Sequence, residues 1–136
     1  MPKAPLISVV EDDQYFRESM KRLMRSLVLM RSLGYSVETF ASAADFLASA
    51  RLGETACLIA DVHMPAMTGL ELHRRLGDSG FRVPTILVTA HYDEDLRARA
   101  LAGGVVCYLR KPIDEGILMR CLREALHSDR PPEENS

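Results

Sequence analysis

Tryptophan is absent from the sequence, aromatic residues make up only 6% of it, and its three cysteines include no Cys-x-x-Cys pair. An odd number of cysteines without paired spacing argues against a disulfide framework, a zinc site or a thioredoxin-like redox motif. Cys57, Cys107 and Cys121 each lie in an apolar stretch. We therefore predict three buried free thiols in the reducing environment of the cytoplasm.

The sequence also lacks a long apolar run and an excess of one charge. No apolar run reaches the length of about 18 residues that a membrane span needs, and the first residues lack the apolar core of a signal peptide. The formal net charge is −2, with 17 basic residues scattered among 19 acidic ones. We predict no membrane span, and no direct nucleic-acid binding by this domain.

A chain of 136 residues, 47% of them hydrophobic, can bury the core of one domain. Near its end, Arg130-Pro131-Pro132 cannot continue a helix, and polar residues follow. We predict one domain over 1–127 and a flexible tail or linker over 128–136. The sequence leaves open whether an output domain belongs to a longer chain.

Short apolar runs alternate with amphipathic segments five times. The apolar runs predict strands at Leu6–Val10, Tyr35–Phe40, Ala56–Ala60, Thr85–Val88 and Val105–Leu109. The remaining patterns predict a first helix that Gly34 ends, then helices from Ser42 to about Ala50, from Thr68 through Leu76, over Glu94–Ala102 and from about Asp114 to Leu126. Apolar strands alternating with helices indicate an α/β fold: a single doubly wound parallel sheet covered on both faces.

Polar residues gather where four of these strands end. They are Glu11, Asp12 and Asp13 after the first strand, Asp61 after the third, Thr89 after the fourth and Lys111-Pro112 after the fifth. In a doubly wound sheet, function concentrates beyond the carboxyl ends of the strands. Two carboxylates about 4 Å apart repel by about 4 kcal/mol at an effective dielectric constant near 20, so such a cluster needs a cation.

A hard divalent ion with oxygen ligands fits this cluster best, and Mg²⁺ is the common cytosolic choice. Lys111 would add a fixed positive charge to the same edge. Such a site is suited to receive a phosphoryl group, with a carboxylate as the nucleophile that gives an acyl phosphate.

Four sequence blocks resemble one family. They are Val10-Glu11-Asp12, Asp61-Val62-His63-Met64-Pro65-Ala66-Met67-Thr68-Gly69, Thr89-Ala90 and Lys111-Pro112. Their spacing, with Thr89 28 residues and Lys111 50 residues after Asp61, resembles the response-regulator receiver domains of two-component signalling. The resemblance covers about residues 6–127 and is closest to receivers that precede helix-turn-helix output domains.

The resemblance implies a flavodoxin-like (βα)5 fold with strand order 2-1-3-4-5. It identifies Asp61 as the phosphorylation site, forming an aspartyl phosphate. It implies a Mg²⁺ site formed by Asp12, Asp61 and the main-chain carbonyl of His63, with Glu11 acting through metal-bound water.

Three further residues correspond to the family's phosphate-binding and switch positions. Thr89 would hydrogen-bond the phosphoryl oxygens, Lys111 would pair with them, and Tyr108 would turn inward as the threonine moves. A cis peptide bond is common in the family at Lys111-Pro112. The implied partner is a sensor histidine kinase or phosphotransfer protein, and a homodimer is a further possibility. Phosphorylation would shift a two-state equilibrium.

Several of these residues also have a simpler structural interpretation. Asp13 favours a role as a helix N-cap over one as a ligand. Thr89 can act as a turn hydroxyl, and Tyr108 as a packing aromatic. His63 and His91 flank the site, where they either affect acyl-phosphate hydrolysis, bind a transition metal, or are exposed loop residues.

The function that we predict is a signalling switch with slow self-dephosphorylation, and such a switch is not an enzyme. Two rival functions are weighed against it. An aspartyl phosphatase on a similar fold needs a second Asp two positions after its nucleophile, where this chain has His63. A pseudo-receiver that binds partners without phosphate usually lacks an acid, the threonine or the lysine, and all of these are present.

One segment departs from the family pattern. Met24-Arg25-Ser26-Leu27 recurs as Met30-Arg31-Ser32-Leu33, which indicates an insertion of about six residues within 24–33. Either the first helix lengthens or the extra residues loop out. We predict a lengthened helix that exposes Val28, Leu29 or Met30, suited to self-association or to altered kinase docking.

Overall fold

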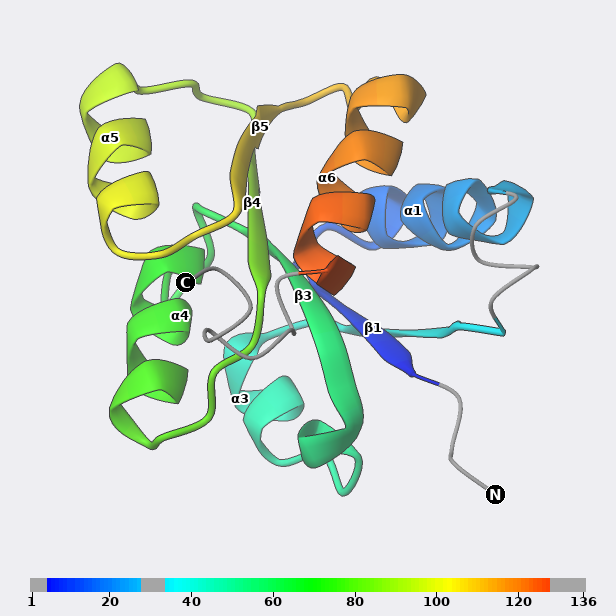
Figure 1. Cartoon of the computed structure of the whole chain (residues 1–136), viewed down its shortest axis with the longest axis horizontal. Helices are drawn as coiled ribbons and strands as arrows, with labels where there is room; N and C mark the ends of the chain where they lie inside the picture. Colours follow the sequence, from blue (N-terminus) through cyan, green and yellow to red (C-terminus); the bar gives the residue numbers. More distant parts are fainter. Residues whose placement is uncertain (1–4, 28–33, 128–136) are drawn as a thin grey trace.

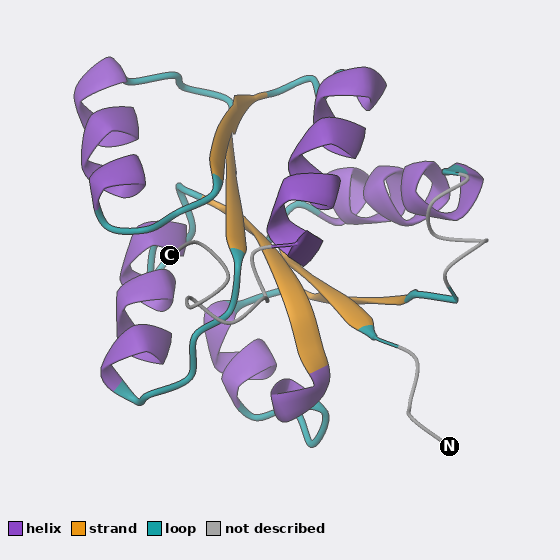
Figure 2. Cartoon of the chain, viewed as in Figure 1, coloured by secondary structure: helices purple, strands orange, loops and turns teal. Residues whose placement is uncertain are grey.

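The computed structural model describes residues 5–27 and 34–127. Five strands alternate with helices along this part of the chain (Figures 1 and 2). The strands are β1 (Leu6–Val10), β2 (Ser36–Phe40), β3 (Thr55–Asp61), β4 (Thr85–Thr89) and β5 (Cys107–Arg110). The helices are α1 (Gln14–Ser26), α3 (Ala43–Leu47), α4 (Gly69–Asp78), α5 (Glu94–Ala102) and α6 (Glu115–His127), with a short 3-10 turn at Leu52–Glu54.

The strands form one parallel sheet in the order β2-β1-β3-β4-β5, which confirms the predicted fold. Helices α1 and α6 cover one face, and α3, α4 and α5 cover the other (Figure 1). The two apolar layers between helices and sheet are separate cores. Because the strands are buried on both sides, β1 and β4 contain no exposed residue. Among the described residues, no helix has the length and apolar character to cross a membrane.

Side-chain caps fix where the helices start. Asp13 accepts a hydrogen bond from the Tyr15 backbone N–H, which confirms its N-cap role. Ser42 caps α3 in the same way. Thr68 and Glu71 form a reciprocal capping box at the start of α4.

Helix α1 ends at Ser26, and Leu27 has extended backbone angles (φ −74°, ψ 132°). The prediction of a lengthened, unbroken helix is therefore wrong. Thirteen helical residues span about 20 Å, close to the length of about 17 Å of the five-residue strands β1 and β2, so a longer helix would pass the edge of its core. Gly34 has a φ of +72° but does not cap α1. Residues 28–33, including Val28, Leu29 and Met30, lie outside the described part of the chain.

The prediction of three free thiols is wrong at two positions. Cys57 is a buried free thiol, as predicted, but Cys107 of β5 and Cys121 of α6 form a disulfide. Their Cα atoms lie 6.2 Å apart, within the usual range for a disulfide. The two residues are 14 positions apart, and it is the packing of α6 on β5 that brings them together.

Candidate functional site

The carboxyl ends of β1 and β3 bring three acidic residues together. Val10 lies beside Ala60 in the sheet, so Glu11 and Asp61, one residue further along their chains, emerge as neighbours. Oxygen atoms of Glu11, Asp12 and Asp61 all lie within 4.8 Å of one another. Glu11 and Asp61 are buried, and Asp12 is exposed. The predicted convergence of these acids at one edge of the sheet is what the structure shows.

Lys111 reaches the same acids from the loop after β5. Its Nζ donates to Glu11 Oε1 at 2.7 Å and to Asp61 Oδ2 at 3.3 Å. Its backbone N–H donates to the Thr89 carbonyl at 2.8 Å, and the Lys111-Pro112 bond is cis. The side chain also passes over the Phe16 ring, with Nζ 4.1 Å from the ring centre. Residues from four separate segments thus fix one ammonium group on two carboxylates.

Burial dominates the electrostatics of Glu11. Its side chain is 1% exposed, and this burial raises its pKa to about 7, with Asp61's negative charge acting in the same direction. Bonds from Lys111 and from the Asp13 backbone N–H oppose the rise without cancelling it. For Lys111, burial acts to lower the pKa, but the bond to Glu11 and the charges of both carboxylates outweigh it and raise the pKa. The site holds excess negative charge that one lysine does not balance.

The loop after β3 shapes the backbone around Asp61. The backbone N–H of His63 donates to Asp61 Oδ1 at 3.1 Å, which holds the carboxylate. A Cβ atom on Gly69 would lie 2.5 Å from the Asp61 carbonyl oxygen and 2.9 Å from Leu87, so only glycine fits there. Ala66 between them has a φ of +71°, which is unusual for a residue with a side chain. The sequence block from Asp61 to Gly69 therefore forms one tight turn that returns the chain to the sheet.

Thr89 ends β4, next to β3. Its hydroxyl accepts from the His91 backbone N–H at 3.0 Å and donates to the His91 carbonyl at 3.1 Å, so it holds a turn. Asp61 pairs with Val88 in the sheet, which places Thr89 one position beyond Asp61 at the same edge. The structure thus shows both the turn contact and the closeness to the acidic cluster.

Tyr108 lies on the opposite face of β5 from Cys107 and Leu109. Its side chain is 6% exposed and packs edge-to-face on Tyr92, with ring centres 5.4 Å apart. Its hydroxyl oxygen is buried with no well-formed hydrogen bond among the described residues, and burial raises its pKa against the opposing effect of the nearby Asp93 backbone and Thr89 hydroxyl. The ring therefore lies in the apolar layer on the face of the sheet that α5 covers.

His63 and His91 are both exposed, and their rings meet edge-to-face with centres 5.8 Å apart. They come from the loops after β3 and β4, each two residues after a predicted site residue, Asp61 or Thr89. Their positions in the sequence predicted that they flank the site. The structure shows in addition that their rings are in contact.

The donor set of the cluster fits a hard divalent cation. Its three side chains offer carboxylate oxygen atoms, and no sulfur or imidazole belongs to this cluster. Oxygen donors of this kind suit Mg²⁺, and a cation there would offset the charge that Lys111 leaves unbalanced. The residues present therefore fit the predicted cofactor.

An apolar groove beside the site was not predicted. It encloses about 440 Å³ and is lined by Tyr15, Phe16, Ser19, Met20, Leu23, Lys111, Pro112 and Ile113. Tyr15 is 78% exposed, an unusual position for a large aromatic ring. Phe16, Met20 and Leu23 recur at helical spacing along the first helix, and the available sequence signal for the groove was Tyr15 directly before them.

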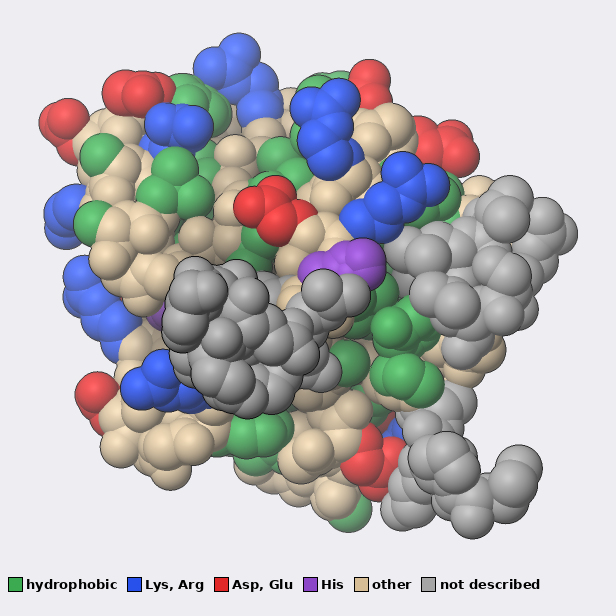
Figure 3. Space-filling view, viewed as in Figure 1, with side chains coloured by type: hydrophobic (Ala, Val, Ile, Leu, Met, Phe, Trp, Pro, Cys, Tyr) green, Lys and Arg blue, Asp and Glu red, His purple; other side chains and the backbone are tan. Residues whose placement is uncertain are grey.

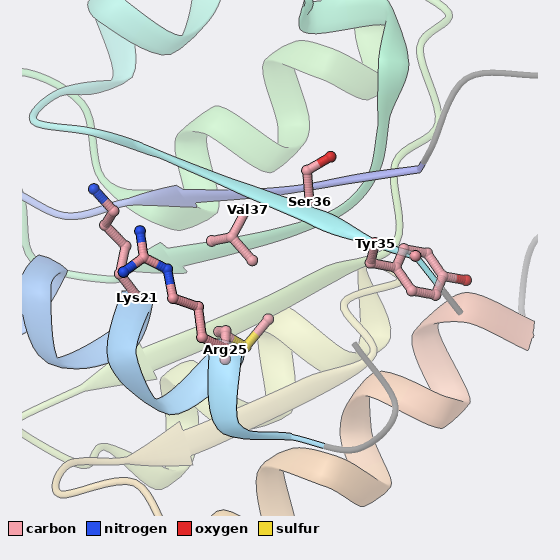
Figure 4. A pocket seen from close by; sticks show the side chains of 7 residues that line it. Lys21, Arg25, Tyr35, Ser36 and Val37 are labelled. Atoms are coloured by element: carbon pink, nitrogen blue, oxygen red, sulfur yellow. The ribbon is translucent and has the colours of Figure 1, made fainter. Parts of the chain in front are cut away.

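A second hollow of about 370 Å³ lies between α1 and β2, away from the acidic cluster. Lys21 and Arg25 rise from α1 beside Val37 of β2 (Figure 4). None of the predicted site residues lines it. On the face shown in Figure 3, basic and acidic side chains are interspersed, in line with the scattered charges of the sequence.

Residues 7–123 match the family model of the response regulator receiver domain. The chain belongs to this family. The receiver is 36% identical over 124 residues to the response regulator protein TodT of Pseudomonas putida, a match that covers 91% of this chain and 52% of TodT. It is 32% identical over 126 residues to the transcriptional regulatory protein FixJ of Azorhizobium caulinodans, covering 93% of this chain and 57% of FixJ.

Among solved structures, the receiver is similar to the response regulator StyR, with a TM-score of 0.76 and 35% identity over 92% of this chain and 60% of StyR. The FixJ-N crystal structure has a TM-score of 0.74 and 28% identity, and covers 93% of this chain and 96% of its own. The receiver spans about half the length of the curated relatives it matches. The chain is thus a receiver domain of two-component response regulators.

Proposed function

We propose that this receiver accepts a phosphoryl group on Asp61 in a Mg²⁺-dependent reaction and changes conformation in response. The observation that supports this most directly is the contact of Lys111 with both Glu11 and Asp61, residues 100 and 50 positions away. An ammonium held on the nucleophilic carboxylate, beside two further acids, is the charge arrangement that phosphoryl transfer to a carboxylate requires.

The donor in this proposal is a phosphohistidine on a sensor kinase or phosphotransfer protein. An oxygen atom of Asp61 attacks phosphorus, the P–O bond forms as the P–N bond breaks, and the histidine leaves as the neutral imidazole after taking up a proton. Bound Mg²⁺, held by Asp12, Asp61 and the His63 carbonyl with Glu11 acting through water, would neutralise charge on the phosphoryl oxygens. Slow attack of water on the acyl phosphate would return the receiver to its starting state.

The side chains around Asp61 orient this reaction. The His63 backbone N–H binds Oδ1 and Lys111 binds Oδ2, so the carboxylate plane is fixed before the donor arrives. After transfer, Lys111 would pair with a phosphoryl oxygen. Thr89 would exchange its bond to the His91 carbonyl for a phosphoryl oxygen, which opens the turn between β4 and α5.

Tyr108 contacts that turn through the ring of Tyr92, on the face of the sheet that α5 covers. Its buried hydroxyl and its contact with Tyr92 make its position sensitive to the loop that contains Thr89 and His91. In the proposal, Thr89 and Tyr108 move together, and the face formed by α5, β5 and α6 presents the change to an output domain or to a second receiver.

The groove between α1 and the loop after β5 is suited to the phosphodonor. Its apolar wall includes Tyr15, Phe16 and Pro112, and Lys111 forms part of both the groove and the acidic site. An amphipathic helix bearing the phosphohistidine would place its apolar face in the groove and its imidazole over Asp61. This geometry favours a helical donor protein over a small phosphomonoester.

The test is incubation of the full chain with acetyl phosphate and Mg²⁺, followed by intact mass measurement. We expect a gain of about 80 Da, the mass of one phosphoryl group, that is lost in Asp61→Asn and in the presence of EDTA. Asp78→Asn, which changes an exposed carboxylate at the end of α4, is the matched control and keeps the gain. Unchanged labelling of Asp61→Asn would contradict the assignment of the nucleophile.

The same preparation distinguishes the phosphatase alternative. His63 occupies the position where an aspartyl phosphatase needs its acid/base carboxylate. We expect no sustained turnover of a generic phosphomonoester by the wild-type protein. Multiple turnovers by the wild-type protein that Asp61→Asn abolishes would favour an enzyme over a switch.

A further inference from the structure

Cys107 and Cys121 connect the last strand to the last helix. Cys107 lies on β5 with its side chain in the layer between the sheet and α6, and Cys121 lies on the facing side of α6. Their Cα atoms are 6.2 Å apart, so neither backbone has to move for the bond to open or close. The pair is therefore preorganised for a bond between β5 and α6.

The segment between the two cysteines includes functional residues. Tyr108 directly follows Cys107, and Lys111 follows four positions later, before α6 begins. β5 is one of the two edge strands and, within the described part of the chain, has only β4 as a hydrogen-bonded neighbour in the sheet. Its position therefore depends more than that of any inner strand on the helices packed against it, and a bond to α6 fixes it further.

Access to the pair is asymmetric. Cys107 is half-buried, whereas Cys121 is 5% exposed. Cys57 is 0% exposed in the same apolar layer, and burial raises its pKa to about 12, so it stays a thiol. Cys107 is thus the more exposed residue of the pair, Cys121 can form the internal bond with it, and Cys57 is shielded.

We propose that Cys107 and Cys121 form a reversible, regulatory disulfide that clamps α6 onto β5. The oxidant is a small-molecule disulfide: the Cys107 thiolate attacks one sulfur and releases one thiol, and the Cys121 thiolate then displaces the second thiol from the mixed disulfide. The protein loses two electrons and two protons, and the reagent becomes two thiols. Excess small-molecule thiol reverses both steps.

The clamp restricts the face that the proposed function uses. With the bond closed, the Cα atoms of Cys107 and Cys121 stay within about 4.4–6.8 Å, so α6 cannot slide along β5. This part of the inference rests on the proposed phosphorylation of Asp61, because the restricted motion is the one that phosphorylation would drive. By linkage, a bond that resists this rearrangement uncouples the motion of α6 from the phosphorylation of Asp61.

The first test counts thiols in the full chain after treatment with glutathione disulfide or with excess dithiothreitol, followed by alkylation in denaturant. We expect three alkylated cysteines after reduction and one, Cys57, after oxidation, from the three in the sequence. Cys57→Ser keeps the loss of two thiols on oxidation, whereas Cys121→Ser can lose only one, as a mixed disulfide of Cys107 with glutathione. Three reactive thiols after oxidation, or disulfides formed between chains, would overturn the proposal.

The second test measures amide hydrogen exchange over α6, with α4 as the internal reference. We expect exchange over 115–127 to slow at least tenfold on oxidation in wild type and Cys57→Ser, and to stay unchanged in Cys121→Ser. Adding acetyl phosphate and Mg²⁺ should then change the exchange rate over α6 in the reduced protein. In the oxidised protein, the exchange rate over α6 should stay within a factor of two of its value before the addition. Equal exchange in both redox states would overturn the clamp, whereas intact clamping with no label on Asp61 would contradict the proposed function alone.

Discussion

The Lys111 ammonium lies 2.7 Å from a Glu11 carboxylate that is 1% exposed, although the two residues are 100 positions apart. This bond does not fully offset the burial of the carboxylate, since the pKa of Glu11 is raised to about 7. Asp61 shares the same ammonium at 3.3 Å. The receiver therefore has an acidic site whose own residues leave negative charge in excess, as a site prepared for a cation does.

We predict that Glu11→Gln stabilises the receiver in EDTA. A neutral amide keeps the bond from the Asp13 backbone N–H and removes the cost of burying a charge, so the free energy of unfolding at about pH 8 should rise by roughly 1–3 kcal/mol. Urea denaturation measures this. Glu124→Gln on the exposed side of α6 is the control and should stay within about 0.5 kcal/mol of wild type. A loss of stability in Glu11→Gln would show that the pair with Lys111 outweighs the burial.

Gly69→Ala should destabilise the receiver by about 1–3 kcal/mol. The new methyl group would meet the Asp61 carbonyl at 2.5 Å and Leu87 at 2.9 Å, which forces the Asp61 backbone to shift. Gly77→Ala lies in the same helix with nothing within 4 Å and should instead stabilise by roughly 0.5–1 kcal/mol. Thermal and urea unfolding of the two variants should therefore move in opposite directions, and equal shifts would refute the steric argument.

Ala66→Gly should stabilise the turn that follows Asp61. Ala66 has a φ of +71°, and glycine adopts this conformation without the steric penalty of a Cβ atom. The folded state should gain about 1 kcal/mol from this, and the greater flexibility of glycine in the unfolded chain offsets part of that gain. Ala98→Gly, at an exposed position within α5, is the matched substitution and should destabilise by roughly 0.5–1 kcal/mol. Equal destabilisation in both variants would show that the turn at Ala66 is not strained.

Cys57 predicts a dependence of stability on alkaline pH in the reduced protein. Burial raises its pKa from 9.0 to about 12, so the folded state keeps the thiol while the unfolded state ionises. A raised folded pKa contributes stability that is present below pH 9 and is lost as the pH rises toward 12. The difference in unfolding free energy between wild type and Cys57→Ala should therefore shrink between about pH 8 and pH 10.5. A constant difference over that range would contradict the burial of this thiol.

Local sequence signals predicted most of the fold. The strand at 6–10 and the helix at 94–102 have the predicted bounds, and Asp13, Ser42 and Thr68 cap helices as expected. These signals depend on residues within a few positions of each other, so they do not need the rest of the molecule. The convergence of the acids, Thr89 and Lys111 could also be predicted, because parallel strands direct their carboxyl ends to one edge.

The errors came from contacts between distant elements. The repeat of Met-Arg-Ser-Leu continues the helical pattern past residue 27, yet α1 ends at Ser26, with its last turn beside Ser36, where β2 begins. Two cysteines without a recognisable spacing meet because α6 packs on β5. The groove at Tyr15 and Phe16 exists because the loop after β5 passes over α1.

By itself, the sequence determined the order of the strands and helices, their caps and the residues at the carboxyl edge, because apolar periodicity and capping act over one or two turns of chain. The tertiary structure alone decided that Lys111 binds Glu11 and Asp61 together, that Cys107 faces Cys121 and that Tyr108 packs inward on Tyr92. Those contacts depend on how helices pack against the sheet, and the free energy that selects them belongs to whole apolar layers rather than to neighbouring residues.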